Sequence, residues 1–205
     1  MPMAVNKKGT PISREVFYDI LLPMVHVINI QGTPNPDALK FILDSRVVAQ
    51  GAKSFDDVKA GQSDPLAQAL FALGPVVSVF CMDRFITVTK FPNTEWEELY
   101  PRVRQVIENT AEPISDKPAI TSETSGPGTR DEMIGKINQI LDENIRPALA
   151  GDGGGLEVMD YNDFVLTVHY QGACGSCPSS QSGTLYAIQN LLQRMVDERI
   201  QVVSA

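Results

Sequence analysis

The sequence has few cysteines, a deficit of basic residues and no long apolar run, and each scarcity excludes a class of protein. Three cysteines in 205 residues are too few for the disulfide framework of a small secreted domain. Seventeen basic residues stand against twenty-five acidic ones, a formal net charge of −8, which argues against a nucleic-acid partner. No stretch approaches the about eighteen apolar residues of a membrane-spanning helix, so we expect no membrane partner.

The first residues of the chain bear on its location. They include Lys7, Lys8 and Arg14 but also Glu15 and Asp19. They lack the apolar core of a signal peptide and the acid-poor character of a transit peptide. Together with the low cysteine content, this predicts a soluble protein in a reducing, cytoplasmic setting.

Two of the three cysteines lie close together in residues 172–180, which read GACGSCPSS. The two-residue spacing of Cys174 and Cys177 lets both sulfurs bind one soft metal centre from the same side. The segment 164–170 alternates like a half-buried strand, and Pro178 suits the first turn of a helix. The pair is therefore predicted in a strand-to-helix loop, where the helix N-terminus lowers the pKa of a thiol.

The cysteine spacing alone leaves three chemistries open. Cys174 and Cys177 could bind an iron–sulfur cluster, hold a zinc ion together with the same pair of a second chain, or act as a dithiol oxidoreductase. The last is the weakest, because too few residues follow Cys177 to complete a thioredoxin fold. Cys81 ends an apolar strand and is interpreted as a buried cysteine without chemistry. His169 alternates out of the apolar face and is interpreted as an exposed polar residue.

Two glycine- or proline-rich stretches are interpreted as structural. Residues 152–155, DGGG, lack the Lys-Ser/Thr of a phosphate-binding loop, which favours a tight turn or close backbone packing. Residues 33–36, TPNP, contain two X-Pro steps that force an extended path, with a docking surface as the alternative interpretation. Gly172 and Gly175 either turn backbone amides toward the sulfurs or satisfy turn geometry.

Periodicity along the chain predicts two small domains of the α/β (α+β) class. An N-terminal extension, 1–25, precedes an α/β domain at 26–110, and a second domain at 130–205 packs helices on a small sheet. Residues 111–129 are rich in Pro, Gly, Ser and Thr, which is typical of a flexible linker with a span of roughly 25 Å. The two domains can therefore move relative to each other.

The predicted elements of the first domain are strands at 26–30 and 39–43, a helix from 63–66, a hairpin of 76–80 and 85–89, and a helix over 96–107. Those of the second are a helix up to Pro147, a hairpin of 156–159 with the strand from 164, a helix from Pro178 and an edge strand at 200–203.

The second domain resembles the C-terminal domain of NifU and of the Nfu iron–sulfur carriers. The matching residues are IRP at 145–147, DGG at 152–154, GACGSCPSS at 172–180 and TL at 184–185. The first domain is similar to the N-terminal domain of many Nfu proteins. The matching residues there are TPNP at 33–36, LKF at 39–41, DPLA at 64–67 and FITVTK at 85–90.

The resemblance implies that Cys174 and Cys177 ligate a labile 4Fe-4S cluster shared between two subunits. It implies a scaffold or carrier, not an enzyme, which assembles or receives the cluster and passes it to apo-proteins. The expected partners are a second copy of the chain, an upstream assembly scaffold and apo iron–sulfur acceptors. The ligand count agrees, because such a cluster takes four thiolates and one chain offers this pair and a distant Cys81. A 2Fe-2S cluster also takes four thiolates, so the cluster type stays open.

Overall fold

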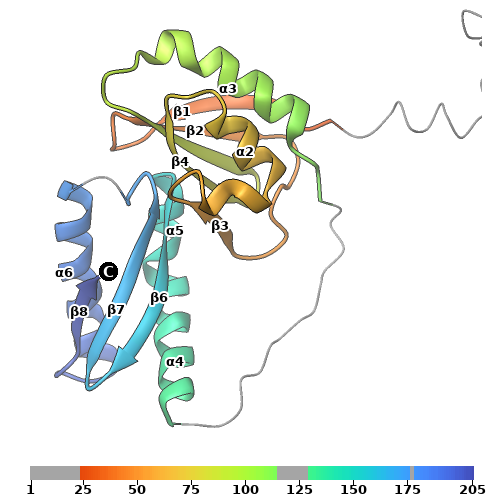
Figure 1. The fold of residues 1–205 in the computed structure, drawn as a ribbon. Coiled ribbons are helices and arrows are strands. Elements are labelled where there is room, and N and C mark those ends of the chain that lie inside the picture. Colours follow the sequence, from red (N-terminus) through yellow and green to blue (C-terminus); the bar gives the residue numbers. More distant parts are fainter. Residues whose placement is uncertain (1–23, 115–128, 176–177) are drawn as a thin grey trace, which may run out of the picture.

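Two sheets organise the chain, as the computed structural model in Figure 1 shows for residues 24–114, 129–175 and 178–205. The first sheet has five antiparallel strands in the order β1-β2-β5-β4-β3. Their bounds are β1 Val27–Gly32, β2 Ala38–Leu43, β3 Ala52–Phe55, β4 Val76–Met82 and β5 Phe85–Lys90. The predicted hairpin of β4 and β5 is confirmed, and its tight turn places Asp83 at a φ of 45°.

Two helices, α2 (Pro65–Phe71) and α3 (Trp96–Thr110), cover one face of this sheet, and a 3-10 turn, η1 (Ala60–Ser63), precedes α2. The predicted start of α2 is confirmed, since the Asp64 carboxylate accepts hydrogen bonds from the Leu66 and Ala67 N–H groups at 3.0 and 3.1 Å. Such a cap satisfies donors that the helix leaves unpaired. The fully buried core residues of this domain include Phe41, Leu43, Leu70, Val79, Ile86, Val88, Leu99, Val103 and Ile107.

The second sheet has three strands in the order β6-β7-β8. Strands β6 (Gly154–Asn162) and β7 (Val165–Gly172) form an antiparallel hairpin, and β8 (Gln201–Ser204) lies parallel to β7 as the predicted edge strand. Three helices accompany it, α4 (Thr129–Asn144), α5 (Arg146–Gly151) and α6 (Pro178–Met195). Its fully buried core residues are Ile137, Leu141, Leu166, Val168, Ile188, Leu192 and Ile200. No helix in the described ranges has the length and apolar character needed to cross a membrane.

The mixed helix-and-sheet class and the two-domain arrangement are as predicted, and the differences are local. Strand β3 was not predicted, because it lies at a sheet edge and only its last residue, Phe55, is buried. Pro147 was expected to end a helix but lies in the first turn of α5, where its missing N–H costs nothing. The N-terminal extension up to residue 23 and most of the predicted linker, 115–128, lie outside the described residues.

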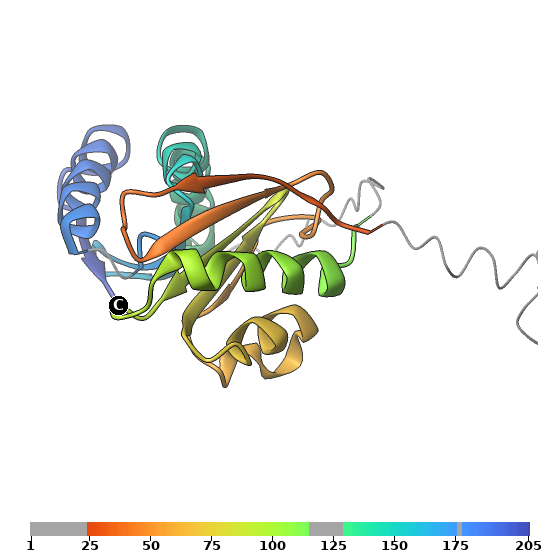
Figure 2. The same cartoon turned by 90° about the horizontal axis from the view of Figure 1, so that it is seen from above.

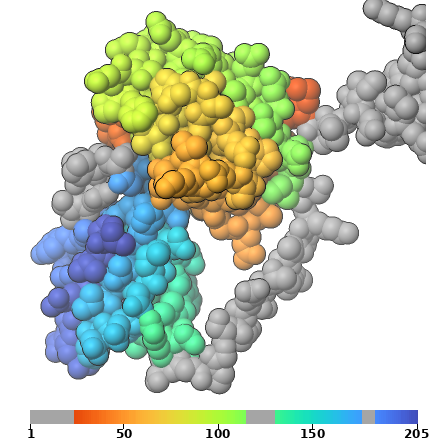
Figure 3. Space-filling model, in the orientation of Figure 1, coloured from red at the N-terminus to blue at the C-terminus, as the bar shows by residue number. Residues whose placement is uncertain are grey.

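The two domains contact each other at one end of the β6-β7 hairpin (Figures 1 and 3). Successive residues of a strand point to opposite faces of its sheet. In β4, Val79 and Cys81 point into the core under α2 and α3, so Phe80 points to the other face. That other face meets the second domain, while α2 and α3 lie on the far side of the first sheet (Figure 2). The first sheet is therefore covered on both faces.

Candidate functional site

Cys174 lies in the loop between β7 and α6, the position that the sequence predicted. Its side chain is buried, with a residue exposure of 4%, and packs with the core of the second domain. The Sγ atom lies against Gly154, where an added Cβ atom would approach it to 2.6 Å. Cys177 lies outside the described residues, and α6 begins at the next position, Pro178. The strand, thiol and helix therefore follow one another as the motif predicted.

One backbone hydrogen bond and the pairing of Gly154 with Gly172 join this thiol loop, residues 172–175, to the glycine turn, residues 152–155, and a second hydrogen bond closes the loop itself. The Ala173 N–H donates to the Gly153 carbonyl at 3.2 Å, and the Gly175 N–H donates to the Gly172 carbonyl at 3.0 Å. Gly153 and Gly172 have φ angles of 80° and 65°, a region that glycine adopts at little cost. The interpretation of DGGG as a tight, closely packed turn is confirmed, and the Gly175 amide serves the turn of its own loop.

Tyr170, on β7, is the titratable neighbour of the thiol loop. Burial, reinforced by the charge of the Cys174 sulfur, raises the pKa of Tyr170 to about 12. Tyr170 therefore stays a neutral phenol beside the thiol at physiological pH. A neutral neighbour adds no second negative charge next to a thiolate, which like-charge repulsion would disfavour.

Cys81 is buried in the core of the first domain, as predicted, with an exposure of 3%. Burial raises the pKa of its thiol to about 12, so Cys81 stays protonated and is a poor metal ligand. Among the residues that the structure describes, no three His, Cys, Asp or Glu side chains gather into a group able to hold a metal ion.

Contacts from the first domain to the thiol loop were not predicted as a site. The Asn35 side chain, from the TPNP stretch, donates from Nδ2 to the carbonyl of Ala173 at 3.1 Å and is 5% exposed. Its Oδ1 accepts the Asp37 N–H at 3.0 Å, and the Thr33 hydroxyl donates to its backbone carbonyl at 2.8 Å. The stretch therefore has the structural role that the sequence favoured, and its Asn35 also contacts the second domain.

Two further contacts cross the domain boundary. Lys40 donates from Nζ to the carbonyls of Ala150 and Gly151, at 2.7 and 3.2 Å. His169 lies on the outer face of its strand, as predicted, with 34% of its side chain exposed. Its Nε2 lies 3.1 Å from Oδ2 of Asp56 in the first domain.

One signal in the sequence could have revealed this boundary. Phe80 and Phe85 fall on the sheet face that no helix of their own domain covers, and exposed aromatic pairs indicate a contact surface.

Comparison with known proteins gives two family matches. Residues 28–113 match "Scaffold protein Nfu/NifU N terminal", and residues 137–203 match "NifU-like domain". NFU1 iron-sulfur cluster scaffold homolog, mitochondrial, from Drosophila willistoni is 36% identical over 175 residues, or 83% of this chain and 61% of that protein. The human protein of the same name is 36% identical over 176 residues, or 83% and 68%. NifU-like protein 5, mitochondrial, from Arabidopsis thaliana is 32% identical over 178 residues, or 83% and 65%. The chain thus spans about three fifths to two thirds of the length of these relatives.

These names contradict the expected cytoplasmic location, because all three relatives are named mitochondrial. The prediction was wrong for a physical reason. A low cysteine content does not distinguish one reducing compartment from another.

Proposed function

Because this chain belongs to the Nfu/NifU family of iron–sulfur cluster scaffold proteins, we propose that it carries a labile 4Fe-4S cluster and delivers it to apo-proteins. Cys174 and Cys177 supply two thiolate ligands, and the same pair from a second copy supplies the other two. The observation that carries the proposal is the place of Cys174 on a strand-to-helix loop in a domain that matches the family. The names of the relatives favour a mitochondrial location.

The thiol inventory supports a cluster shared between two chains. A 4Fe-4S cluster takes four thiolates, and the chain has three cysteines. Cys81 is buried in the core of the N-terminal domain, where burial raises the pKa of its thiol to about 12. Two thiols per chain are left, so a symmetric pair of chains completes the ligand set.

The proposed chemistry is ligand exchange, with the cluster as cargo. An incoming thiolate of an acceptor binds one iron, and one thiolate of the carrier leaves that iron and takes up a proton. Four such exchanges move the cluster without a net change in its oxidation state. The chain binds, presents and releases the cluster, and no catalytic residue is assigned. An upstream assembly scaffold or free iron and sulfide would load it.

Anaerobic reconstitution with iron and sulfide tests the proposal. We expect about two irons per chain and a four-iron Mössbauer spectrum on a dimer isolated by size exclusion. The variants Cys174→Ser and Cys177→Ser should lose the brown chromophore and the cluster-dependent dimer, whereas the matched control Cys81→Ala should keep both.

Three other outcomes have defined meanings. Retention of the cluster by the double serine variant would refute the proposed ligands. Zinc at about half an equivalent per chain, with no bound iron, would replace the carrier by a structural zinc-bridged dimer. A two-iron spectrum would keep the ligands and change the cluster type.

A further inference from the structure

We propose that the N-terminal domain is a reversible cover for the thiol loop, and that its docked position excludes the second copy of the chain that a shared cluster requires. The consequence for cluster loading rests on the proposed function. The cover itself rests only on contacts between the two domains. Three contacts support the cover. Each is made by a residue of the N-terminal domain, either on the sheet face opposite α2 and α3 or in the loop between β1 and β2.

The first contact is the ring of Phe80, which has no exposed surface. An added Cβ on Gly155 would lie 2.9 Å from its Cζ, and one on Gly172 would lie 2.9 Å from its Cγ. The ring therefore sits directly on the glycine turn and on the first residue of the thiol loop. Phe80 points away from the core of its own domain, so its burial depends on the second domain.

The second contact is Asn35, which reaches the residue next to Cys174. Its hydrogen bond to the Ala173 carbonyl is buried, and Ala173 itself is 2% exposed. The Asn35 side chain is fixed by its own loop through the Asp37 amide, so its donor is already oriented toward the thiol loop. The backbone beside the thiol is thereby closed to other molecules.

The third contact is Lys40, which binds the C-terminal end of α5. Its ammonium donates to the carbonyls of Ala150 and Gly151, and the Ala150 carbonyl also accepts the Gly153 N–H at 3.2 Å. A cation at a helix C-terminus is also favoured by the helix dipole. The same ammonium lies 4.3 Å from the centre of the Phe85 ring. Lys40 therefore contacts an aromatic ring of its own domain and two carbonyls of the second domain.

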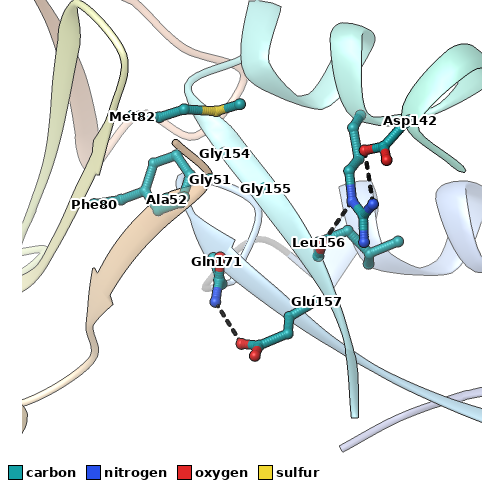
Figure 4. Close-up of a pocket in the computed structure, with 11 residues that line it drawn as sticks. Gly51, Ala52, Phe80, Met82, Asp142, Gly154, Gly155, Leu156, Glu157 and Gln171 are labelled. Atoms are coloured by element: carbon teal, nitrogen blue, oxygen red, sulfur yellow. Dashed lines mark hydrogen bonds and ion pairs between the residues drawn. The ribbon is translucent and has the colours of Figure 1, made fainter. Parts of the chain in front are cut away.

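The boundary also carries defects that favour reversible docking. The hydroxyls of Thr87 and Thr89 are buried and have no hydrogen-bond partner among the described residues, and such groups oppose burial. Thr87 lies at the contact itself, with Oγ1 3.0 Å from the Cβ position of Gly153. A half-open pocket of about 460 Å³ lies at the domain boundary, lined by Phe80 and Met82 on one side and by Gly154, Gly155 and Gln171 on the other (Figure 4). The buried, unpaired hydroxyls therefore lower the free energy gained on docking.

Docking and dimerisation compete for the same surface. A shared cluster requires the partner's thiol pair to lie within the width of one cluster from Cys174, because all four thiolates bind the same cluster. Phe80 and Asn35 already occupy the space over residues 172 and 173. Because residues 115–128 join the two domains, the cover is present at an effective concentration of about millimolar, well above a micromolar second copy. The chain without a cluster is therefore kept covered.

Alkylation of Cys174 by N-ethylmaleimide, followed by peptide mass spectrometry on the cluster-free full chain, tests the cover. Lys40→Glu places a carboxylate against two carbonyl oxygens and should raise the alkylation rate at least about tenfold, the effect of losing one charge-assisted hydrogen bond. Lys59→Glu, an exposed lysine in the same domain, makes the same change in charge and should leave the rate unchanged. Gly155→Val, whose side chain would collide with Phe80, should reproduce the effect of Lys40→Glu without a charge change.

The outcomes separate the cover from the proposed function. Unchanged alkylation of Cys174 in both folded variants would overturn the cover, whether or not iron binds. Faster alkylation with no iron uptake by any variant would support the cover and refute the carrier role. Faster alkylation together with faster assembly of the bridged dimer in Lys40→Glu would support both parts. Faster alkylation with an unchanged rate of dimer assembly would overturn the claim that docking excludes the second copy.

Discussion

Replacement of Phe80 by alanine separates the docking of the two domains from the folding of each. The Phe80 side chain is completely buried between β4 and the glycines at 155 and 172. In an undocked N-terminal domain the same ring would face water, because it points away from α2 and α3. Its truncation should therefore weaken docking and leave the free energy of unfolding of the N-terminal domain almost unchanged.

The magnitude follows from the area that docking buries. Moving a phenylalanine side chain from water to a fully buried site is worth about 1.5–3 kcal/mol. The contact of Phe80 with Phe85, at 6.0 Å between ring centres, lies within one domain and exists in both states, so it adds nothing. The docking equilibrium constant should fall roughly 10- to 150-fold.

Small-angle X-ray scattering and chemical denaturation, measured on the same samples, check this prediction. Phe80→Ala should increase the radius of gyration and leave the unfolding transition of the N-terminal domain in place. Phe91→Ala removes a ring that is 55% exposed and should change neither quantity. If Phe80→Ala instead lowered the free energy of unfolding by about 3–5 kcal/mol, the usual cost in a core, and left the radius of gyration unchanged, the two-state docking argument would be refuted.

Two further predictions concern the N-terminal domain. Asp64→Ala should lower its free energy of unfolding by about 1–2 kcal/mol, measured in urea. Burial opposes ionisation of Asp64, but hydrogen bonds from Lys53 and two amides prevail and lower its pKa. The stabilisation should thus be complete above about pH 4, be lost as the pH falls through the folded-state pKa, and be absent from the variant; an unaltered acid dependence would contradict this role. Cys81, with a pKa of about 12, should have about one thiol in ten thousand ionised at pH 8. Maleimide labelling of Cys81 should therefore follow global unfolding in urea, and rapid labelling in native buffer would show that this core is open.

Elements with a strong internal repeat could be predicted from the sequence. In α6, Leu185, Ile188 and Leu192 recur at intervals of three and four and pack into the core. The hairpin of β4 and β5 is rich in Val, Ile, Phe and Thr around a short turn, which favours paired strands. Strand β3 could not be predicted, because an edge strand with one buried residue carries no alternation. Helix α5 was missed because Pro147 indicates a helix end and a helix start equally well.

The thiol loop could be predicted because its signal is local, whereas the cover could not. Cys174 stands in a motif that reads as strand, loop and helix within a short stretch. Asn35 and Ala173 are 138 positions apart, and no periodicity in either segment reports that they meet. Phe80 and Phe85 lie on the sheet face that no helix of their own domain covers, which indicates that something packs there. The folded chain alone shows that this partner is the second domain.

Lys40 of the other domain binds the C-terminal end of helix α5, and this contact affects the turn that supports the thiol. When Lys40 withdraws, the carbonyls of Ala150 and Gly151 lose their ammonium donor. The Ala150 carbonyl keeps the Gly153 N–H, so the last turn of this short helix is held less firmly but stays formed. Gly154, against which the Cys174 sulfur rests, follows only three residues later. Undocking of the N-terminal domain therefore also loosens the turn against which the sulfur packs, so that the sulfur gains room to reorient toward iron.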